Sequence, residues 1–231
     1  MRLPQFLLAA TAALLATASS AASAASVNVQ FSRDQGAQQT GGAVVGGAGD
    51  QWNDLFGNTG SGTLFDAAGA DTGINLSFSA GLVYESQLGY TQFTGTPYSN
   101  LMQGYLVGFM DSTPIDLKFS GLAAGQTYGF WIYTQGDNNS AGRSISLSAN
   151  GGDAAIATQT NANQFTLGDN YVYIVTHADA YGTVDIVGRD LNGEANINGV
   201  QLMAIPEPTS LALMAAGLLF AAGAAARKRS R

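Results

Sequence analysis

Apolar and polar residues alternate along several short segments of the chain. The alternation is clearest in residues 74–79, 115–120 and 144–149, where every second side chain is apolar. A period of two places the apolar side chains on one face of a β-strand, so each segment predicts a strand with one buried and one solvated face. Residues 127–134 and 171–175 are apolar on both faces and rich in aromatic and β-branched residues, which predicts central strands.

Turn residues separate these segments. Clusters of Gly, Asn and Asp occur at 135–143 and 149–155, and glycine makes up 30 of the 231 residues, about twice its usual share of ~7%. Helical periodicity is confined to the two ends of the chain. Many short strands joined by such turns predict an all-β fold, a single antiparallel β-sandwich or jelly roll over residues 26–204.

The two ends carry apolar segments of a different kind. Residues 1–25 combine Arg2, an apolar stretch and the small residues Ala22-Ser23-Ala24, the layout of a secretory signal peptide. We therefore expect a signal helix that takes the chain to the Sec translocon and is removed by signal peptidase. The alternative is a retained membrane anchor.

The C-terminal segment is uncharged from Leu211 to Ala226, which is 16 residues. A membrane-spanning helix needs about 20 apolar residues, with a lower limit of about 17, and Thr209 and Ser210 extend the segment to 18. A basic stop follows it, and basic residues favour the cytoplasmic side. The stop consists of Arg227, Lys228, Arg229 and Arg231. The sequence thus predicts a hydrophobic helix with the sandwich outside the cytoplasm.

Three residues precede this helix: Pro206, Glu207 and Pro208. The motif, the apolar run and the basic stop, in this order at the chain end, resemble the PEP-CTERM sorting signal of proteins exported by Gram-negative bacteria. The resemblance covers residues 205–231. It implies that an exosortase recognises the tail, removes it and releases the protein towards the surface, and it implies an association with exopolysaccharide and biofilm. The alternative is an ordinary single-span anchor.

The body also resembles a galactose-binding-domain type of jelly roll. The resemblance depends on short segments in a characteristic order, among them "WNDLFG", "FSGLAAGQTYGFWIYTQGD" and "INGVQL". It implies two antiparallel sheets packed face to face.

Charge and composition exclude several functions. The body has four basic and 15 acidic residues, a net charge of −11, whereas the whole chain has −7. Such a body is repelled by nucleic acid and by anionic membrane surfaces. Because the chain lacks cysteine, disulfides, thiol catalysis and thiolate metal sites are excluded.

Catalytic signals are weak. His177 is the only histidine, and we interpret it as a residue at a strand end. Most aspartates stand beside Gly or Asn and are typical of turns, so the paired carboxylates of a glycosidase are not indicated. We expect no catalytic residues. The alternatives are a secreted carbohydrate-active enzyme and a lectin-like glycan-binding module on the same sandwich.

Two candidate binding sites remain. Trp131 lies in a predicted core strand, so we interpret it as core packing, whereas loop aromatics are better placed to contact a glycan. These loop residues are Trp52, Tyr90, Phe93 and Tyr98. Asp190, Asn192 and Glu194 carry side-chain oxygens at alternate positions, a pattern that suits a calcium ion. The leading hypothesis is a non-catalytic surface or matrix protein that needs no cofactor other than this calcium.

Overall fold

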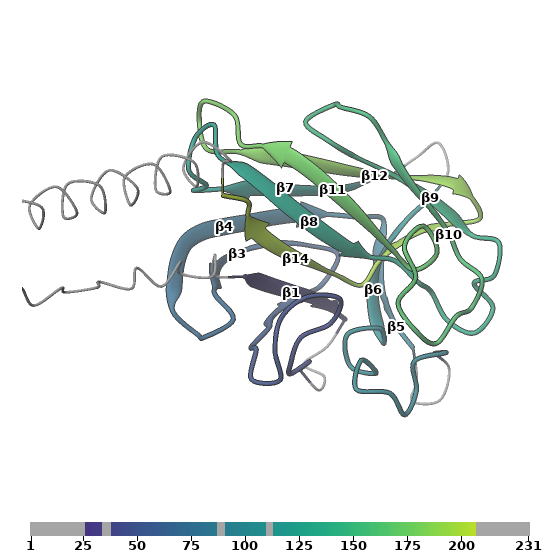
Figure 1. The fold of residues 1–231 in the computed structure, drawn as a ribbon. Helices are drawn as coiled ribbons and strands as arrows, with labels where there is room; N and C mark the ends of the chain where they lie inside the picture. Colours follow the sequence, from purple (N-terminus) through teal and green to yellow (C-terminus); the bar gives the residue numbers. More distant parts are fainter. Residues whose placement is uncertain (1–25, 34–37, 87–90, 110–112, 207–231) are drawn as a thin grey trace, which may run out of the picture.

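The computed structural model describes residues 26–33, 38–86, 91–109 and 113–206 (Figure 1). Within these ranges all regular structure is β, so the predicted all-β class is confirmed. Both predicted terminal helices lie outside the described residues. Among the described residues, no helix is long and apolar enough to cross a membrane. The strands are β1 (Val27–Ser32), β2 (Asn53–Phe56), β3 (Thr59–Phe65), β4 (Asp71–Ser79), β5 (Leu82–Glu85), β6 (Gly104–Gly108), β7 (Ile115–Ser120), β8 (Thr127–Tyr133), β9 (Ser144–Ala149), β10 (Ala155–Thr158), β11 (Tyr171–His177), β12 (Val184–Asn192), β13 (Ala195–Ile197) and β14 (Gly199–Ala204).

Two large sheets form the sandwich. One has the strand order β11-β8-β14-β1-β2 and the other β10-β9-β12-β7-β4-β3, while β13-β6-β5 form a small third sheet. Among these strands every pairing is antiparallel except that of β1 with β2. The large sheets meet through buried rings: Phe119 of β7 lies 5.3 Å from Phe130 of β8, centroid to centroid. Burying such apolar faces is the main source of stability in a sandwich.

The alternating segments behave as predicted. In β7 and β9 the apolar residues are buried and the polar ones between them are partly or fully exposed. The segment 127–134 forms β8, which lies between β11 and β14 as expected of a central strand. The same expectation is wrong for 171–175, because β11 is an edge strand and leaves Tyr173 and Val175 exposed. The apolar residues on the second face of β11 contribute instead to an aromatic platform on the outer face of the sheet.

The chain enters and leaves the sandwich at one end. Val27 at the start of β1 pairs with Leu202 near the end of β14. Ile205 is still tied to this end, because its N–H donates to the carbonyl of Thr127 at 2.8 Å and its carbonyl accepts from Gln126 Nε2 at 2.7 Å. We call this end the exit end, at the left in Figure 1, and the opposite one the far end.

Candidate functional site

An aromatic platform lies on the outer face of the five-stranded sheet. Trp131 of β8 and Tyr173 of β11 stand opposite each other in register, and their ring centroids are 4.6 Å apart with the planes tilted by 33°. Trp131 is half-buried and Tyr173 is 40% exposed. Cross-strand aromatic pairs of this kind hold each other in place. The platform therefore presents preorganised ring surface outside the core.

Gly129 makes room for the platform. It precedes Trp131 by two residues and so shares its face of β8. A Cβ atom at this position would lie 2.9 Å from the Oη and Cε2 atoms of Tyr173 and 3.3 Å from the indole of Trp131. A glycine inside a strand often marks a close approach, and here the two rings fill the space. Any side chain at position 129 would displace them.

A groove of about 920 Å³ opens beside Trp131. Its lining combines two strand residues, Trp131 and Met203, which we call the floor, with two further segments, residues 45–50 and residues 66–68 with Ser26, which we call the walls. We call it the Trp131 groove. Its lining residues are Ser26, Val45, Gly46, Gly47, Gly49, Asp50, Asp66, Ala67, Ala68, Trp131 and Met203. Because Ser26 and Met203 adjoin the ends of β1 and β14, the groove lies towards the exit end.

Buried polar side chains fix the glycine-rich wall to the sheet. Gln201, which is fully buried, donates from Nε2 to the carbonyl of Val45 at 3.1 Å. The hydroxyl of Tyr133 accepts from the N–H of Val44 at 3.0 Å and donates to Gln201 Oε1. Burial raises the pKa of Tyr133, so its phenol keeps the proton that this bond needs. The wall is thus a fixed part of the fold despite its many glycines.

Two half-buried carboxylates line the groove. Asp50 Oδ2 accepts from the N–H of Gly47 at 3.0 Å. Asp66 Oδ1 accepts from the N–H groups of Ala68 and Ala70 at 2.9 and 2.8 Å. Both sets of bonds are turn chemistry, which the sequence predicted for Asp50 beside its glycine and not for Asp66. The second oxygen of each carboxylate makes no hydrogen bond or ion pair within the described part of the chain.

A smaller groove of about 470 Å³ is also lined by Asp66. Asp54 of β2 also lines it. Burial raises the pKa of Asp54, although Ser32 Oγ donates to Asp54 Oδ1 at 2.5 Å and counteracts the rise. Two carboxyl groups therefore border this smaller groove, one of which binds its proton more tightly than usual.

Two of the four loop aromatic residues that were predicted to contact a glycan are buried. Trp52 is 3% exposed and Phe93 is fully buried, so the expectation that they are exposed is wrong for both. Trp52 Nε1 donates to the carbonyl of Gly41 at 2.8 Å. Phe93 packs on Phe165 with centroids 5.1 Å apart. Tyr98 is half-buried against the same ring, and Tyr90 lies outside the described residues.

These aromatic residues instead form a second core under the loops, around Tyr133. Trp131 was interpreted as core packing, and it is half-buried against this second core on the outer face of the five-stranded sheet. A segment that is apolar on both faces does not reveal which face the second sheet covers. The glycine at position 129, two residues before a tryptophan, was the one available sequence signal for the platform.

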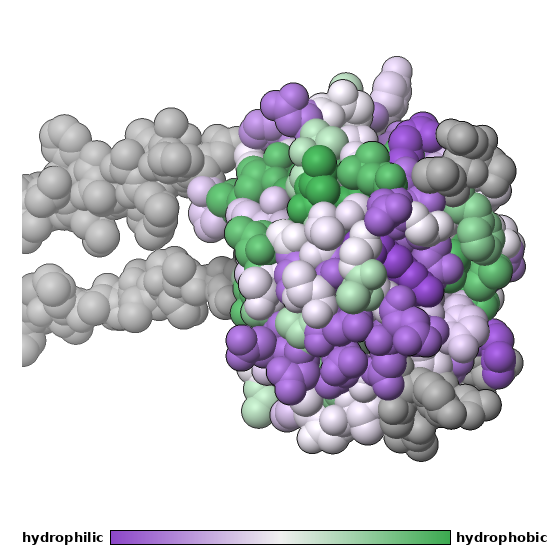
Figure 2. All heavy atoms as spheres, turned by 90° about the vertical axis from the view of Figure 1, so that its right-hand side faces the viewer, coloured by the Kyte–Doolittle hydropathy of each residue, from purple (hydrophilic) through white to green (hydrophobic). Residues whose placement is uncertain are grey.

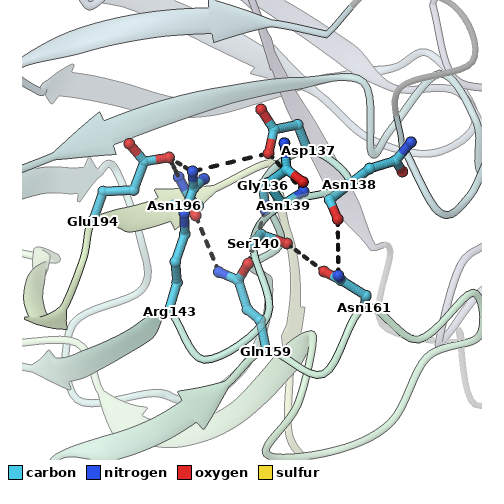
Figure 3. Close-up of polar contacts among 10 residues, drawn as sticks. All are labelled: Gly136, Asp137, Asn138, Asn139, Ser140, Arg143, Gln159, Asn161, Glu194 and Asn196. Atoms are coloured by element: carbon cyan, nitrogen blue, oxygen red, sulfur yellow. Dashed lines mark hydrogen bonds and ion pairs between the residues drawn. The ribbon is translucent and has the colours of Figure 1, made fainter.

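A polar cluster around Arg143 occupies the far end (Figure 3). Arg143 Nη1 donates to Glu194 Oε1, and Arg143 Nη2 lies 3.9 Å from Asp137 Oδ1. Burial raises the pKa of Tyr105, and the negative charges of Asp137 and Glu194 add to the rise. Figure 2 shows this end of the molecule, where hydrophilic residues cover much of the lower and central surface.

Buried amides connect this cluster to the strands. Gln159 Nε2 donates to Asn196 Oδ1 at 3.0 Å, and Gly136 N–H donates to Gln159 Oε1 at 3.0 Å. Gln159 and Asn196 are both almost fully buried. We interpret the cluster as the support of the far-end loops, because its charges are satisfied internally.

The predicted calcium ligands lie near this cluster with different partners. Glu194 is engaged by Arg143, and Asn192 Nδ2 donates to the carbonyl of Gly142 at 2.8 Å. Both carboxylate oxygens of Asp190 are buried and have no hydrogen-bond partner within the part of the chain that the structure describes. Among the described residues, no group of three or more His, Cys, Asp or Glu side chains is placed to hold a metal ion. The calcium site stays a prediction.

Arg143→Met is expected to lower the free energy of unfolding by about 1–3 kcal/mol, because it leaves Glu194 and Asp137 partly buried without their cation. Urea denaturation measures the change. Lys118→Met is the matched control: its pair with Asp185 is more than half exposed, and such pairs contribute about 0–1 kcal/mol. Equal losses in the two variants would contradict a supporting role of the cluster.

The C-terminal segment matches a known family. Residues 204–229 match the family model of the PEP-CTERM protein-sorting motif, so the predicted sorting signal is confirmed. This signal implies a secreted protein that is associated with the cell surface and processed by an exosortase. No curated protein matches the chain at a significant level.

Several solved structures share part of the fold. An exo-β-1,3-galactanase from Phanerochaete chrysosporium has 12% identity and a TM-score of 0.35; the match covers 63% of this chain and 27% of that one. A Bacillus subtilis protein has 8% identity and a TM-score of 0.42, with coverages of 78% and 40%. A family 35 carbohydrate-binding module from Clostridium thermocellum has 15% identity and a TM-score of 0.36, with coverages of 56% and 92%. This chain thus spans about a quarter of the galactanase, and similarity at this level transfers no ligand or activity.

Proposed function

We propose that this PEP-CTERM protein is a non-catalytic surface or matrix module that holds extracellular polysaccharide in the Trp131 groove. The observation that carries the proposal is an open groove with an aromatic floor and polar walls on an exported sandwich. The sorting signal brings such a module to the place where exopolysaccharide accumulates.

The groove has the chemistry that a sugar chain requires. A pyranose ring has an apolar C–H face that packs on an aromatic ring, and hydroxyl groups around its edge that need hydrogen-bond partners. Trp131 and Met203 supply the apolar surface, while Asp50, Asp66 and the glycine-rich backbone supply polar atoms. Ligand sites commonly combine an apolar floor with a few placed polar groups. Because the walls are fixed, little ordering is needed on binding.

The tail determines when the module is released. In this proposal the Sec translocon exports the chain, signal peptidase removes residues 1–25, and the C-terminal helix holds the protein briefly in the inner membrane. An exosortase then cleaves near Pro206 and frees the sandwich. The groove would lie near the membrane until this step, because it lies towards the exit end.

Trp131→Ala is expected to weaken binding of the processed protein to exopolysaccharide from its own host at least tenfold. A stacked aromatic ring contributes about 0.5–1.5 kcal/mol beyond its area burial, and its loss also empties the groove floor. Co-sedimentation with the purified polysaccharide gives the affinity. Tyr181→Ala is the matched control, because Tyr181 is 90% exposed and lies outside the groove. Unchanged binding by the Trp131 variant would refute the groove as the site.

The enzyme alternative has one observation in its favour. Asp54, whose pKa is raised by burial, and Asp66 both border the smaller groove, and glycosidases use one protonated and one ionised carboxyl group. Asp66 Oδ1, however, accepts from two backbone N–H groups, which indicates that this side chain stabilises a turn. We therefore expect no release of reducing ends from the host polysaccharide. Release that Asp54→Asn abolishes would establish the enzyme instead.

A further inference from the structure

We propose that the Trp131 groove selects a positively charged polysaccharide, one whose amino sugars carry free amino groups. This inference depends on the proposed function, because it names the class of glycan that the same groove takes. Three features of the described residues carry it: the charge of the lining residues, the place of the basic residues, and the free carboxylate oxygens.

The lining of the groove has negative charge and no positive charge. Asp50 and Asp66 contribute two carboxylates, and none of the other lining residues is Lys, Arg or His. Neither carboxylate has a cationic partner among the described residues, since their hydrogen bonds come from backbone N–H groups only. A cleft lined by one sign of charge concentrates ligands of the opposite sign.

The rest of the body strengthens this field. Its four basic residues are Arg33, Lys118, Arg143 and Arg189. Lys118 pairs with Asp185, and Arg143 pairs with Glu194 at the far end. None of the four lines the groove, and the body carries a net charge of −11. An acidic polysaccharide would therefore be repelled.

The two carboxylates are positioned to receive an ammonium group. Asp50 and Asp66 belong to two segments that line the groove together with Trp131, and the N–H of Gln51 ties these segments to each other by donating to the carbonyl of Ala67 at 2.9 Å. Backbone bonds fix one oxygen of each, which leaves the other as an acceptor. An ammonium group has three donors, and its hydrogen bonds to carboxylates are stronger than those between neutral groups. The indole of Trp131 adds a cation–π contribution.

An amino sugar satisfies both parts of the groove at once. Its ring packs on the aromatic floor and its ammonium group reaches a wall carboxylate. A fully acetylated chain keeps the ring contact and loses the charged one. A basic peptide keeps the charged contact and lacks the sugar face.

The experiment measures binding of the processed protein to the hexamer of glucosamine and to the hexamer of N-acetylglucosamine by titration calorimetry. We expect the amino form, at a pH where it is protonated, to bind at least tenfold more tightly. The preference should shrink as salt rises from 0.05 to 0.5 M, because salt screens charge pairs. Hexalysine should bind more weakly than the glucosamine hexamer.

Asp50→Asn and Asp66→Asn test the carboxylates directly. Asparagine keeps the side-chain oxygen that accepts the turn N–H groups and removes the charge. Each variant should reduce the preference about threefold to tenfold, and the double variant should abolish it. Asp179→Asn is the matched control, because Asp179 accepts from the N–H groups of Tyr181 and Thr183 at 2.9 and 2.8 Å outside the groove.

The outcomes separate this inference from the proposed function. Equal binding of both hexamers, lost in Trp131→Ala, would overturn the charge selection and leave the polysaccharide groove standing. Binding of the amino form that Asp179→Asn weakens as much as Asp50→Asn would also overturn the selection, since the site would then be the general negative field. Failure of Trp131→Ala to affect any polysaccharide would overturn both.

Discussion

Gly199→Ala is expected to lower the free energy of unfolding by about 3 kcal/mol, a large share of the ~5–15 kcal/mol that holds a domain folded. Gly199 begins β14, which lies between β1 and β8. A Cβ atom there would lie 2.4 Å from the carbonyl oxygen of Val29 and 2.7 Å from Leu101 Cδ1. Val29 cannot withdraw without breaking the ladder of β1 with β14, so the strands would have to separate. Thermal or urea unfolding of the purified variant measures the loss.

Gly49→Ala is the matched control for this prediction. It adds the same methyl group where no atom lies within 4 Å and where the backbone is not in the left-handed region. Its free energy of unfolding should change by less than about 0.5 kcal/mol. A Gly199 variant as stable as the Gly49 variant would show that β1 and β14 can yield, contrary to the tight packing described here.

The sandwich could be predicted from the sequence because its strands bury one face and expose the other to solvent. β7 and β9 are simple alternations, and the polar residues between their apolar ones leave only one way to place the core. The order of strands within the sheets could not be predicted in this way, because it depends on contacts between distant segments. β11, for example, has the composition of a central strand and lies at an edge.

The sequence does not predict the groove either, because the exposure of its residues also depends on contacts between distant segments. Trp131 and Trp52 are both aromatic residues in apolar surroundings, and only the folded arrangement shows that Trp131 faces outward while Trp52 is covered by the glycine-rich loop. Whether a loop aromatic is exposed depends on which other loops pack over it. Of the two aspartates of the groove, Asp50 was predicted as a turn residue, whereas Asp66 was not singled out, and only the folded structure brings both to the same groove as Trp131.

The glycines also divide into those that a local turn requires and those that a distant neighbour in the fold requires. Many glycines were interpreted as turn residues, and Gly125 and Gly182 do have the positive φ angles of turns. Gly129 and Gly199 are different, since they lie within strands and make room for rings or for a neighbouring backbone. Nothing in the flanking residues identifies these neighbours.

The fold and the sorting signal are connected at the exit end. Ile205 makes the last backbone hydrogen bond to the sheet, and the exposed Pro206 follows it directly. Residues 206–210 separate the sandwich from the apolar run, and five extended residues reach at most about 18 Å. An exosortase that recognises the motif therefore acts within a short interval between the folded body and the apolar run.

Glu207→Ala is expected to leave most of the protein unprocessed, with an intact mass that still includes Arg231. Pro206 and Pro208 disfavour helix and hold an extended chain, so the carboxylate between them is the one charged group that a membrane enzyme meets before the apolar run. Without it, recognition loses a charge-assisted contact at the site of cleavage. Intact-mass spectra of protein from cells with an active exosortase measure the processed fraction. Thr209→Ala, two residues further on, should be cleaved normally. If the Glu207 variant were released as completely as the Thr209 variant, the enzyme would be recognising the helix and the basic stop rather than the motif.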